Sequence, residues 1–210
     1  MAISFAKAGA SYIAAGARSD LTKLGQDIEA AAASANRPKP KLLLLKLDVT
    51  DQQSVQEAAD SVRREFGKMD IVISNAGALI NMATVTESDP EIWWGDYILN
   101  LKGPFLISRA FIPLLLEGEM KTLVFNASAG AHLAMPGTSA YQGAKAATLR
   151  LCAHIDAEYS EKGLITFCVH PGNVPTDAVG GIDGLPDHLK PGKIRAVRAK
   201  MLIFIFRTLI

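Results

Sequence analysis

The sequence lacks the features that mark secreted, membrane-spanning or nucleic-acid-binding proteins. Its two cysteines, Cys152 and Cys168, form neither a C-x-x-C spacing nor a disulfide framework. The formal net charge is only +1, so no strong field favours a nucleic acid. The apolar start has no basic segment and is interrupted by Lys7, and the apolar end is about half a membrane span long. We therefore expect no signal peptide, no transmembrane segment, no nucleic-acid partner and a cytoplasmic location.

Metal-ligand patterns are missing as well. The sequence has four histidines, and these are not clustered with Cys, Asp or Glu at metal-ligand spacing, so no metal site is predicted. What the chain does have is 49% hydrophobic and 20% charged residues over 210 positions, a composition typical of one globular domain. We predict a single domain over residues 1–210.

Short apolar runs alternate with segments of helical periodicity along the chain. Strands are predicted at 11–15, 42–47, 71–74, 123–126 and 165–169, with amphipathic helices between them. The continuous run 42–47 predicts a strand that is buried on both faces. Alternating strands and helices predict an α/β fold, a Rossmann-like doubly wound parallel sheet with helices on both faces.

Tyr141 and Lys145 stand four residues apart in a predicted helix, so they share one face. A free tyrosine titrates near ~10, so acid/base work near pH 7 needs a shift worth about 4 kcal/mol. A cation about 4 Å away at an effective dielectric of about 20 supplies roughly that energy. Ser128, at the end of an apolar run, is placed to donate to a substrate oxygen. The alternative is an ordinary pair on a surface helix.

Several further motifs accompany this pair. In order and spacing they resemble the short-chain dehydrogenase/reductase superfamily, from Met1 to about Ala178. The motifs are Asp48-Val49-Thr50, Ser74-Asn75-Ala76-Gly77, Asn100, Ser128, Tyr141-x-x-x-Lys145 and Pro171-Gly172-x-x-x-Thr176.

The resemblance implies a catalytic set of Asn100, Ser128, Tyr141 and Lys145. Tyr141 then exchanges the proton, Ser128 steadies the oxygen, and Lys145 lowers the pKa of Tyr141 and binds the nicotinamide ribose. Asn100 holds a helix distortion and a water that relays protons to Lys145. Pro104 is expected to interrupt that helix near Asn100, because it removes a backbone hydrogen bond. Asn100 is otherwise a packed hydrogen-bonding residue.

The resemblance also implies a nicotinamide cofactor. Arg18, which follows the first predicted strand, favours the 2′-phosphate of NADP(H), with NAD(H) as the alternative and a solvent-facing arginine as the bland interpretation. Asp48 has a second interpretation as a helix-capping residue. The implied cofactor-binding residues, beside Tyr141 and Lys145, are Arg18, Asp48, Val49, Asn75, Ala76, Gly77, Pro171, Gly172, Val174 and Thr176.

The strand and glycine-rich turn with which the family opens are missing. We expect about twenty residues to precede Met1 in the full protein, and otherwise a degenerate fold. The sheet is expected to be incomplete at both ends, with unpaired backbone groups where the first strand would lie. Residues 190–210, rich in basic and apolar side chains, are interpreted as a substrate-lid helix, with a membrane-surface helix as the alternative.

These features predict an NADP(H)-dependent oxidoreductase that interconverts a carbonyl and an alcohol. Apolar Leu133, Ala134 and Met135 suggest a small apolar substrate. The alternative is a redox-inactive relative, acting as a binding or scaffold protein or as a non-redox isomerase or cyclase. The resemblance further implies a homodimer or homotetramer built through the helices that contain Asn100 and Tyr141.

Overall fold

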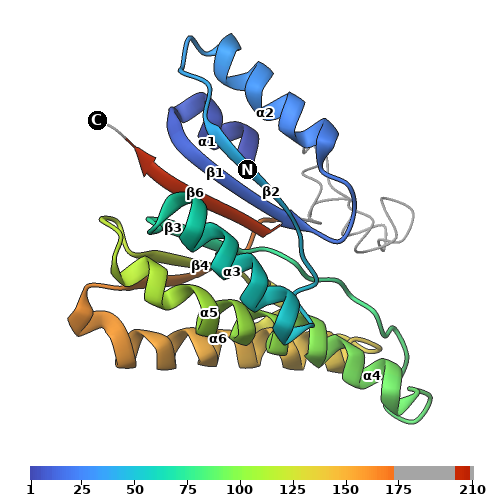
Figure 1. Ribbon diagram of the computed structural model, residues 1–210. Helices are drawn as coiled ribbons and strands as arrows, with labels where there is room; N and C mark the ends of the chain where they lie inside the picture. Colours follow the sequence, from blue (N-terminus) through green and yellow to red (C-terminus); the bar gives the residue numbers. More distant parts are fainter. Residues whose placement is uncertain (173–201, 209–210) are drawn as a thin grey trace.

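The computed structural model describes residues 1–172 and, for the backbone, 202–208 (Figure 1). A six-stranded sheet has the order β2-β1-β6-β3-β4-β5. Its strands are β1 (Ala10–Ala17), β2 (Lys41–Lys46), β3 (Ile71–Ser74), β4 (Thr122–Asn126), β5 (Ile165–Val169) and β6 (Leu202–Thr208). The helices are α1 (Ala2–Ala8), α2 (Thr22–Ser34), α3 (Gln52–Phe66), α4 (Pro90–Tyr97), α5 (Gly103–Leu116) and α6 (Ser139–Tyr159), with short turns η1 (Ile98–Lys102), η2 (Ala129–His132) and η3 (Ser160–Lys162).

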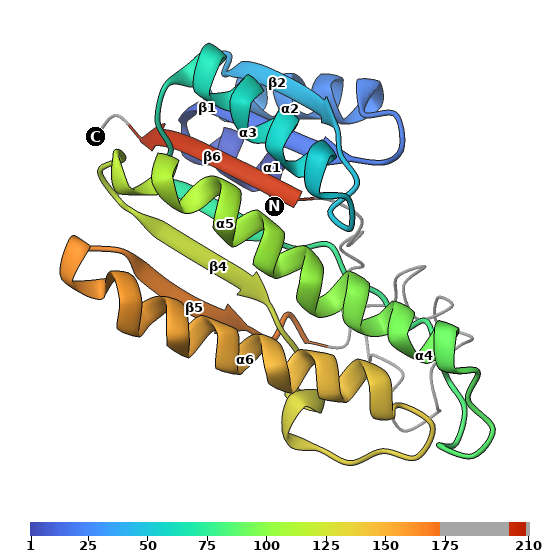
Figure 2. The ribbon, with the colours of Figure 1, turned by 60° about the horizontal axis from the view of Figure 1, so that its bottom comes forward.

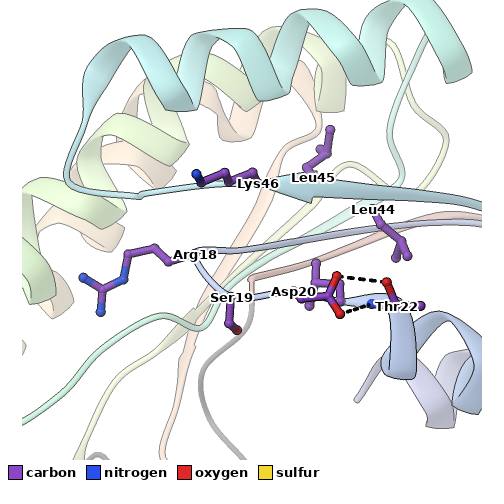
Figure 3. A pocket seen from close by; sticks show the side chains of 8 residues that line it. Arg18, Ser19, Asp20, Thr22, Leu44, Leu45 and Lys46 are labelled. Carbon is purple, nitrogen blue, oxygen red and sulfur yellow. Dashed lines mark hydrogen bonds between the residues drawn. The ribbon is translucent and has the colours of Figure 1, made fainter.

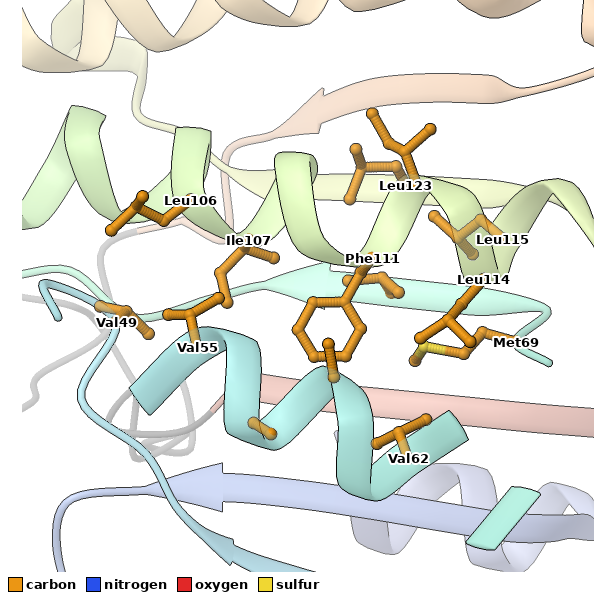
Figure 4. Packing of buried hydrophobic residues seen from close by; sticks show 14 of the residues in the cluster. Val49, Val55, Val62, Met69, Leu106, Ile107, Phe111, Leu114, Leu115 and Leu123 are labelled. Carbon is orange, nitrogen blue, oxygen red and sulfur yellow. The ribbon is translucent and has the colours of Figure 1, made fainter. Parts of the chain in front are cut away.

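Helices cover both faces of the sheet, as predicted. Helices α1 and α2 lie on one face, and α3, α5 and α6 lie on the other (Figures 1 and 2). Phe111 of α5 is fully buried against Val55 and Val62 of α3 in the larger core cluster (Figure 4). Burial of one such aromatic side chain stabilises the fold by roughly 3 kcal/mol, so this cluster fixes α5 on the sheet.

The expected gap in the sheet is filled. Strand β6 lies between β1 and β3 and pairs antiparallel with both, Ile205 opposite Ile13 on one side and Ile71 on the other (Figure 1). The prediction of unpaired rows was wrong because a late segment supplies the missing backbone partners. The sheet is therefore mixed, and the interpretation of residues 190–210 as one helix was wrong for Leu202–Thr208.

Strand β2 is at the edge of the sheet, which corrects the prediction of a strand buried on both faces. It pairs only with β1, and Leu44 is 39% exposed. Lys41 and Lys46 stand at its two ends. Charged ends of this kind discourage pairing with another chain, and Lys46 lies inside the run 42–47 from which the strand was predicted.

Within residues 1–172, one helical run has the length and composition of a membrane span. It covers Pro90–Leu116, that is α4, η1 and α5, and 56% of its most apolar window is buried inside the fold. Leu106, Ile107 and Phe111 of this run belong to the core of the sheet. Its apolar character is thus accounted for by packing in the domain.

Candidate active site

Three predicted site segments meet at one edge of the sheet. Strands β3, β4 and β5 are parallel, so the residues that follow them lie at the same edge. Asn75 and Gly77 follow β3, Ser128 follows β4, and Pro171 and Gly172 follow β5. The positive φ of Gly172, 83°, is one that glycine adopts without strain. Val174 and Thr176 lie outside the described residues.

Helix α6 brings Lys145 and Tyr141 to this edge. Lys145 is only 3% exposed, and its Nζ donates to the carbonyl oxygen of Asn126 at 2.8 Å. The same Nζ lies 5.7 Å from the centre of the Tyr141 ring. Ser128 Oγ accepts from the Gly130 amide at 3.0 Å, which fixes the hydroxyl at the start of η2. The structure therefore brings Ser128, Tyr141 and Lys145 together.

Burial shifts the pKa values of Lys145 and Tyr141. It lowers the pKa of Lys145 to about 8, against the opposing effects of Cys168 and Asp96. Burial also raises the pKa of Tyr141, outweighing the hydrogen bond with Ser128, which lowers it. The direction for Tyr141 is opposite to the expected effect of Lys145, because desolvation of the phenolate outweighs its neighbours here.

Asn100 lies at the centre of the π-helical turn η1 and is fully buried. Its Nδ2 donates to the Ala78 carbonyl at 2.8 Å, and its Oδ1 accepts from the Ala78 amide at 3.3 Å. Thr148 of α6 donates to the Asn100 carbonyl at 2.8 Å. Pro104 follows at the start of α5, so the predicted interruption of the helix is confirmed.

Gly77 is held against Asn100 and Lys145. A β-carbon at Gly77 would lie 2.8 Å from Asn100 Oδ1 and 3.1 Å from Lys145 Nζ. Asn75, beside it, accepts from Asn126 Nδ2 at 2.9 Å, while Asn126 Oδ1 is buried without a partner among the described residues. The turn after β3 therefore needs glycine in order to approach the two side chains.

Asp96 was missed by the sequence interpretation. It is fully buried in the last turn of α4, and its carboxylate accepts from the amides of Ile80 at 3.2 Å and Asn81 at 2.8 Å. Asn100 Nδ2 also reaches the Asp96 carboxylate, at 3.3 Å. The only sequence signal is an acid four residues before Asn100, and it does not reveal contacts with a distant loop.

A second cluster lies where β1 and β2 end. Ala17 is paired with Lys46, so Arg18 and Lys46 are neighbours, and their side chains extend to the same side (Figure 3). They line a hollow of about 370 Å³ with Ser19, Asp20 and Leu45. Lys46 was missed because it lies within the run 42–47, which was interpreted only as a strand. This hollow lies at the end of β1 and β2, apart from Ser128 and Tyr141.

Asp48 and Val49 follow β2. Asp48 Oδ1 accepts from the Thr50 hydroxyl at 2.7 Å and the Thr50 amide at 2.9 Å, and the hydroxyl bond is the main reason that the pKa of Asp48 is lowered. The N-cap of α3 is Asp51, so Asp48 shapes the preceding turn instead of capping the helix. Val49 is buried against Gly103.

The sequence pattern of the short chain dehydrogenases matches residues 1–183. The chain belongs to this family. A short chain dehydrogenase of Monascus ruber, pigC, is 56% identical over 190 residues, which cover 90% of this chain and 63% of that protein. Another from Aspergillus terreus, tazN, is 47% identical over 193 residues, 90% of this chain and 41% of that protein. The chain thus spans about two fifths to two thirds of the length of these relatives.

Among solved structures, an alcohol dehydrogenase from the archaeon Thermococcus sibiricus, complexed with 5-hydroxy-NADP, shares the fold. The TM-score is 0.75 at 24% identity, and the match covers 95% of this chain and 80% of that one. The short-chain dehydrogenase fold is therefore shown by both sequence and structure.

The described residues fit two parts of a nicotinamide cofactor. Gly77, which has no side chain, lets the turn after β3 lie against Lys145, and Asn126 Oδ1 is buried without a partner among the described residues. Arg18 and Lys46 form a cationic pair at the other end. Between these regions β6 begins at Leu202, paired with Gly16, instead of a strand that ends in a glycine-rich turn.

Proposed function

We propose that the protein is an NADP(H)-dependent oxidoreductase that interconverts a carbonyl and an alcohol. The observation that carries this proposal is the convergence of Ser128, Tyr141 and Lys145 at the carboxyl edge of the sheet. When bound, the cofactor supplies or accepts the hydride. The remaining chemistry is proton transfer and charge stabilisation, which these side chains provide.

Each side chain has a distinct role. The Tyr141 hydroxyl gives or takes the proton of the substrate oxygen, and the Ser128 hydroxyl donates to the same oxygen. Lys145, held by the Asn126 carbonyl, places a positive charge beside the Tyr141 ring and favours its phenolate. Asn100 holds the turn after β3 in place through its two hydrogen bonds with Ala78. In its proposed role in a proton relay, a bound water carries the proton.

Two cations support NADP(H) over NAD(H). Arg18 and Lys46 flank one hollow, and a 2′-phosphate binds guanidinium and ammonium groups through charge-assisted hydrogen bonds. Solved relatives are complexed with NAD as well as with 5-hydroxy-NADP, so the choice rests on these two cations. An acidic residue does stand at this hollow, but the Asp20 carboxylate already accepts from the Thr22 amide at 3.2 Å and hydroxyl at 2.9 Å.

The substrate is proposed to be small and apolar. Met82 is 61% exposed and Leu133 is 59% exposed. The loops that carry them meet at Gly137, where an added β-carbon would lie 3.7 Å from the Ala83 amide. Exposed apolar side chains on adjoining loops near Ser128 suit a hydrophobic substrate.

We also keep a cytoplasmic location and a homodimer or homotetramer as proposals, with Phe105 of α5, 48% exposed, as a candidate contact.

One observation favours a redox-inactive binding protein as the second candidate. Strand β6 fills the position from which the family's glycine-rich turn would lead to the cofactor pyrophosphate, and it runs in the opposite direction. The described residues would hold the cofactor only at the two ends of the cofactor molecule.

Calorimetric titration of the 210-residue chain with NADPH, and with NADH in parallel, separates the two functions. A micromolar dissociation constant, about −8 kcal/mol, with NADPH preferred supports the oxidoreductase. A folded chain that binds neither cofactor up to millimolar concentration contradicts it and favours the binding protein. Lys145→Met is the control, because it removes the charge proposed to contact the ribose.

A further inference from the structure

A buried carboxylate stands behind the proposed catalytic group. Asp96 is 0% exposed, and both of its oxygens accept backbone amides, from Ile80 and Asn81. Four residues later, Asn100 holds both the amide and the carbonyl of Ala78. Two side chains of one helical run therefore fix the segment from Ala78 to Asn81, which directly follows Gly77.

This clamp is adjacent to Lys145. A β-carbon added to Gly77, the residue before this segment, would lie 2.8 Å from Asn100 Oδ1 and 3.1 Å from Lys145 Nζ, so the backbone there packs beside the ammonium. Asp96 in turn lies next to Asn100, because Asn100 Nδ2 donates to the Asp96 carbonyl at 3.0 Å and to the Asp96 carboxylate at 3.3 Å. Its negative charge acts on Lys145 through protein, where screening by water is weak.

Few ionisable groups surround Lys145 within the part of the chain that the structure describes. They are Asp96 from α4, Cys168 from β5 and Tyr141 from α6 itself. The hydrogen bond with Cys152 and burial raise the pKa of the Cys168 thiol, so it is neutral where Lys145 titrates, near pH 8. Tyr141 is neutral there too, because burial raises its pKa. Burial raises the pKa of Asp96, but both of its oxygens accept N–H donors, as the ionised carboxylate does.

We infer that Asp96 is a positioning residue that holds the loop after β3 in place and supplies the buried negative charge that keeps Lys145 protonated. The inference rests on the proposed function only in its naming of Lys145 as catalytic. A buried carboxylate is costly unless it is hydrogen-bonded and balanced by a charge. Two amides and the nearby ammonium meet both requirements.

The test is the titration of Lys145, followed by the ¹³Cε NMR signal of ¹³C-lysine-labelled protein, with the signal assigned by its loss in Lys145→Met. Asp96→Asn keeps the shape and removes the charge. We expect the Lys145 midpoint to move to lower pH by about half a unit or more. We also expect faster hydrogen exchange at Ile80 or Asn81. The substituted side chain has one acceptor oxygen, whereas the backbone amides of Ile80 and Asn81 each bond a separate carboxylate oxygen in the wild type.

Asp70→Asn is the matched control. Asp70 is also buried and accepts two backbone amides, from Glu119 at 2.7 Å and Met120 at 3.5 Å, but it precedes β3, at the opposite edge of the sheet. We expect this variant to lose stability without moving the Lys145 midpoint. An unchanged midpoint in Asp96→Asn would overturn the inference and leave Asp96 as a loop anchor alone.

A reciprocal measurement covers the case in which Asp96→Asn does not fold. Coupling between two charges is symmetric, so Lys145→Met must move the ¹³Cγ titration of Asp96 to higher pH by the same amount. No movement there contradicts the inference. Neither titration needs a cofactor or turnover, so the inference and the proposed oxidoreductase activity fail or succeed separately.

Discussion

The Tyr97 hydroxyl lies against Gly143, the residue midway between Tyr141 and Lys145 in α6. A β-carbon at Gly143 would overlap this hydroxyl. One turn earlier, Trp93 Nε1 donates to Ser139 Oγ at 3.0 Å, and the Trp93 and Tyr97 rings pack 4.8 Å apart. The position of α6 is thus set by contact with α4.

We therefore expect Gly143→Ala to destabilise the protein by about 1–3 kcal/mol, because overpacking forces α6 away from α4. Tyr97→Phe removes the clashing oxygen, so the double variant should recover part of the loss. Urea unfolding of the four proteins in this cycle measures the coupling. Strictly additive losses would show that the clash is relieved elsewhere.

Tyr141→Phe and Ser128→Ala address the proposed chemistry. Each removes one hydroxyl, and we expect a loss of about 10²- to 10⁴-fold in kcat for a carbonyl substrate that the wild-type chain reduces. The affinity for NADPH should stay within a few-fold, because neither hydroxyl carries charge. Ser160→Ala, in η3 beyond the end of α6, is the control. Full activity in Tyr141→Phe would refute the assigned role.

The sequence was sufficient for the local features of this fold. The apolar runs before Ser74 and Asn126 gave strands that end where predicted. Pro104 gave the interruption near Asn100, because the loss of a backbone donor is a property of the residue itself.

Features that depend on distant partners were missed. Asp96 accepts from the backbone amides of Ile80 and Asn81, and the side chains of these two residues do not indicate that their amides bind a carboxylate. Lys46 meets Arg18 only through the pairing of β1 with β2. The position of β6 depends on pairing with strands more than a hundred residues away, which periodicity does not encode.

Arg18→Asp tests the choice of cofactor. Replacing the guanidinium by a carboxylate repels a 2′-phosphate and accepts a 2′-hydroxyl, so we expect NADPH to bind about 10- to 100-fold more weakly and NADH to bind no worse. Calorimetry with both cofactors measures the change. Lys39→Ala is the control, since Lys39 is exposed and pairs with Glu29. Equal weakening for both cofactors would argue against a 2′-phosphate site.

The lowered pKa of Lys145 predicts a pH-dependent stability. Its pKa is about 8 in the folded chain against 10.5 in the unfolded chain, so the unfolded state binds more protons between these values. The free energy of unfolding contributed by Lys145 therefore rises with pH across this window, by a total on the order of 3 kcal/mol. Urea unfolding from pH 7.5 to 10 should show this slope in the wild type and not in Lys145→Met. Equal slopes would mean that Lys145 titrates normally.

Proline in β6 tests whether this strand completes the sheet. Ile205 is paired with Ile13 on one side and Ile71 on the other, so β6 is a central strand. Proline removes a backbone donor and does not fit a central strand, so Ile205→Pro should cost roughly 3 kcal/mol or more. Ile205→Val keeps the N–H and the β-branched shape and is the matched control. Urea unfolding measures both variants.

Because β1 and β3 carry Arg18 and Gly77 on opposite sides of β6, the proline variant should also lose NADPH binding. A stable, NADPH-binding proline variant would mean that β1 and β3 hold together without β6.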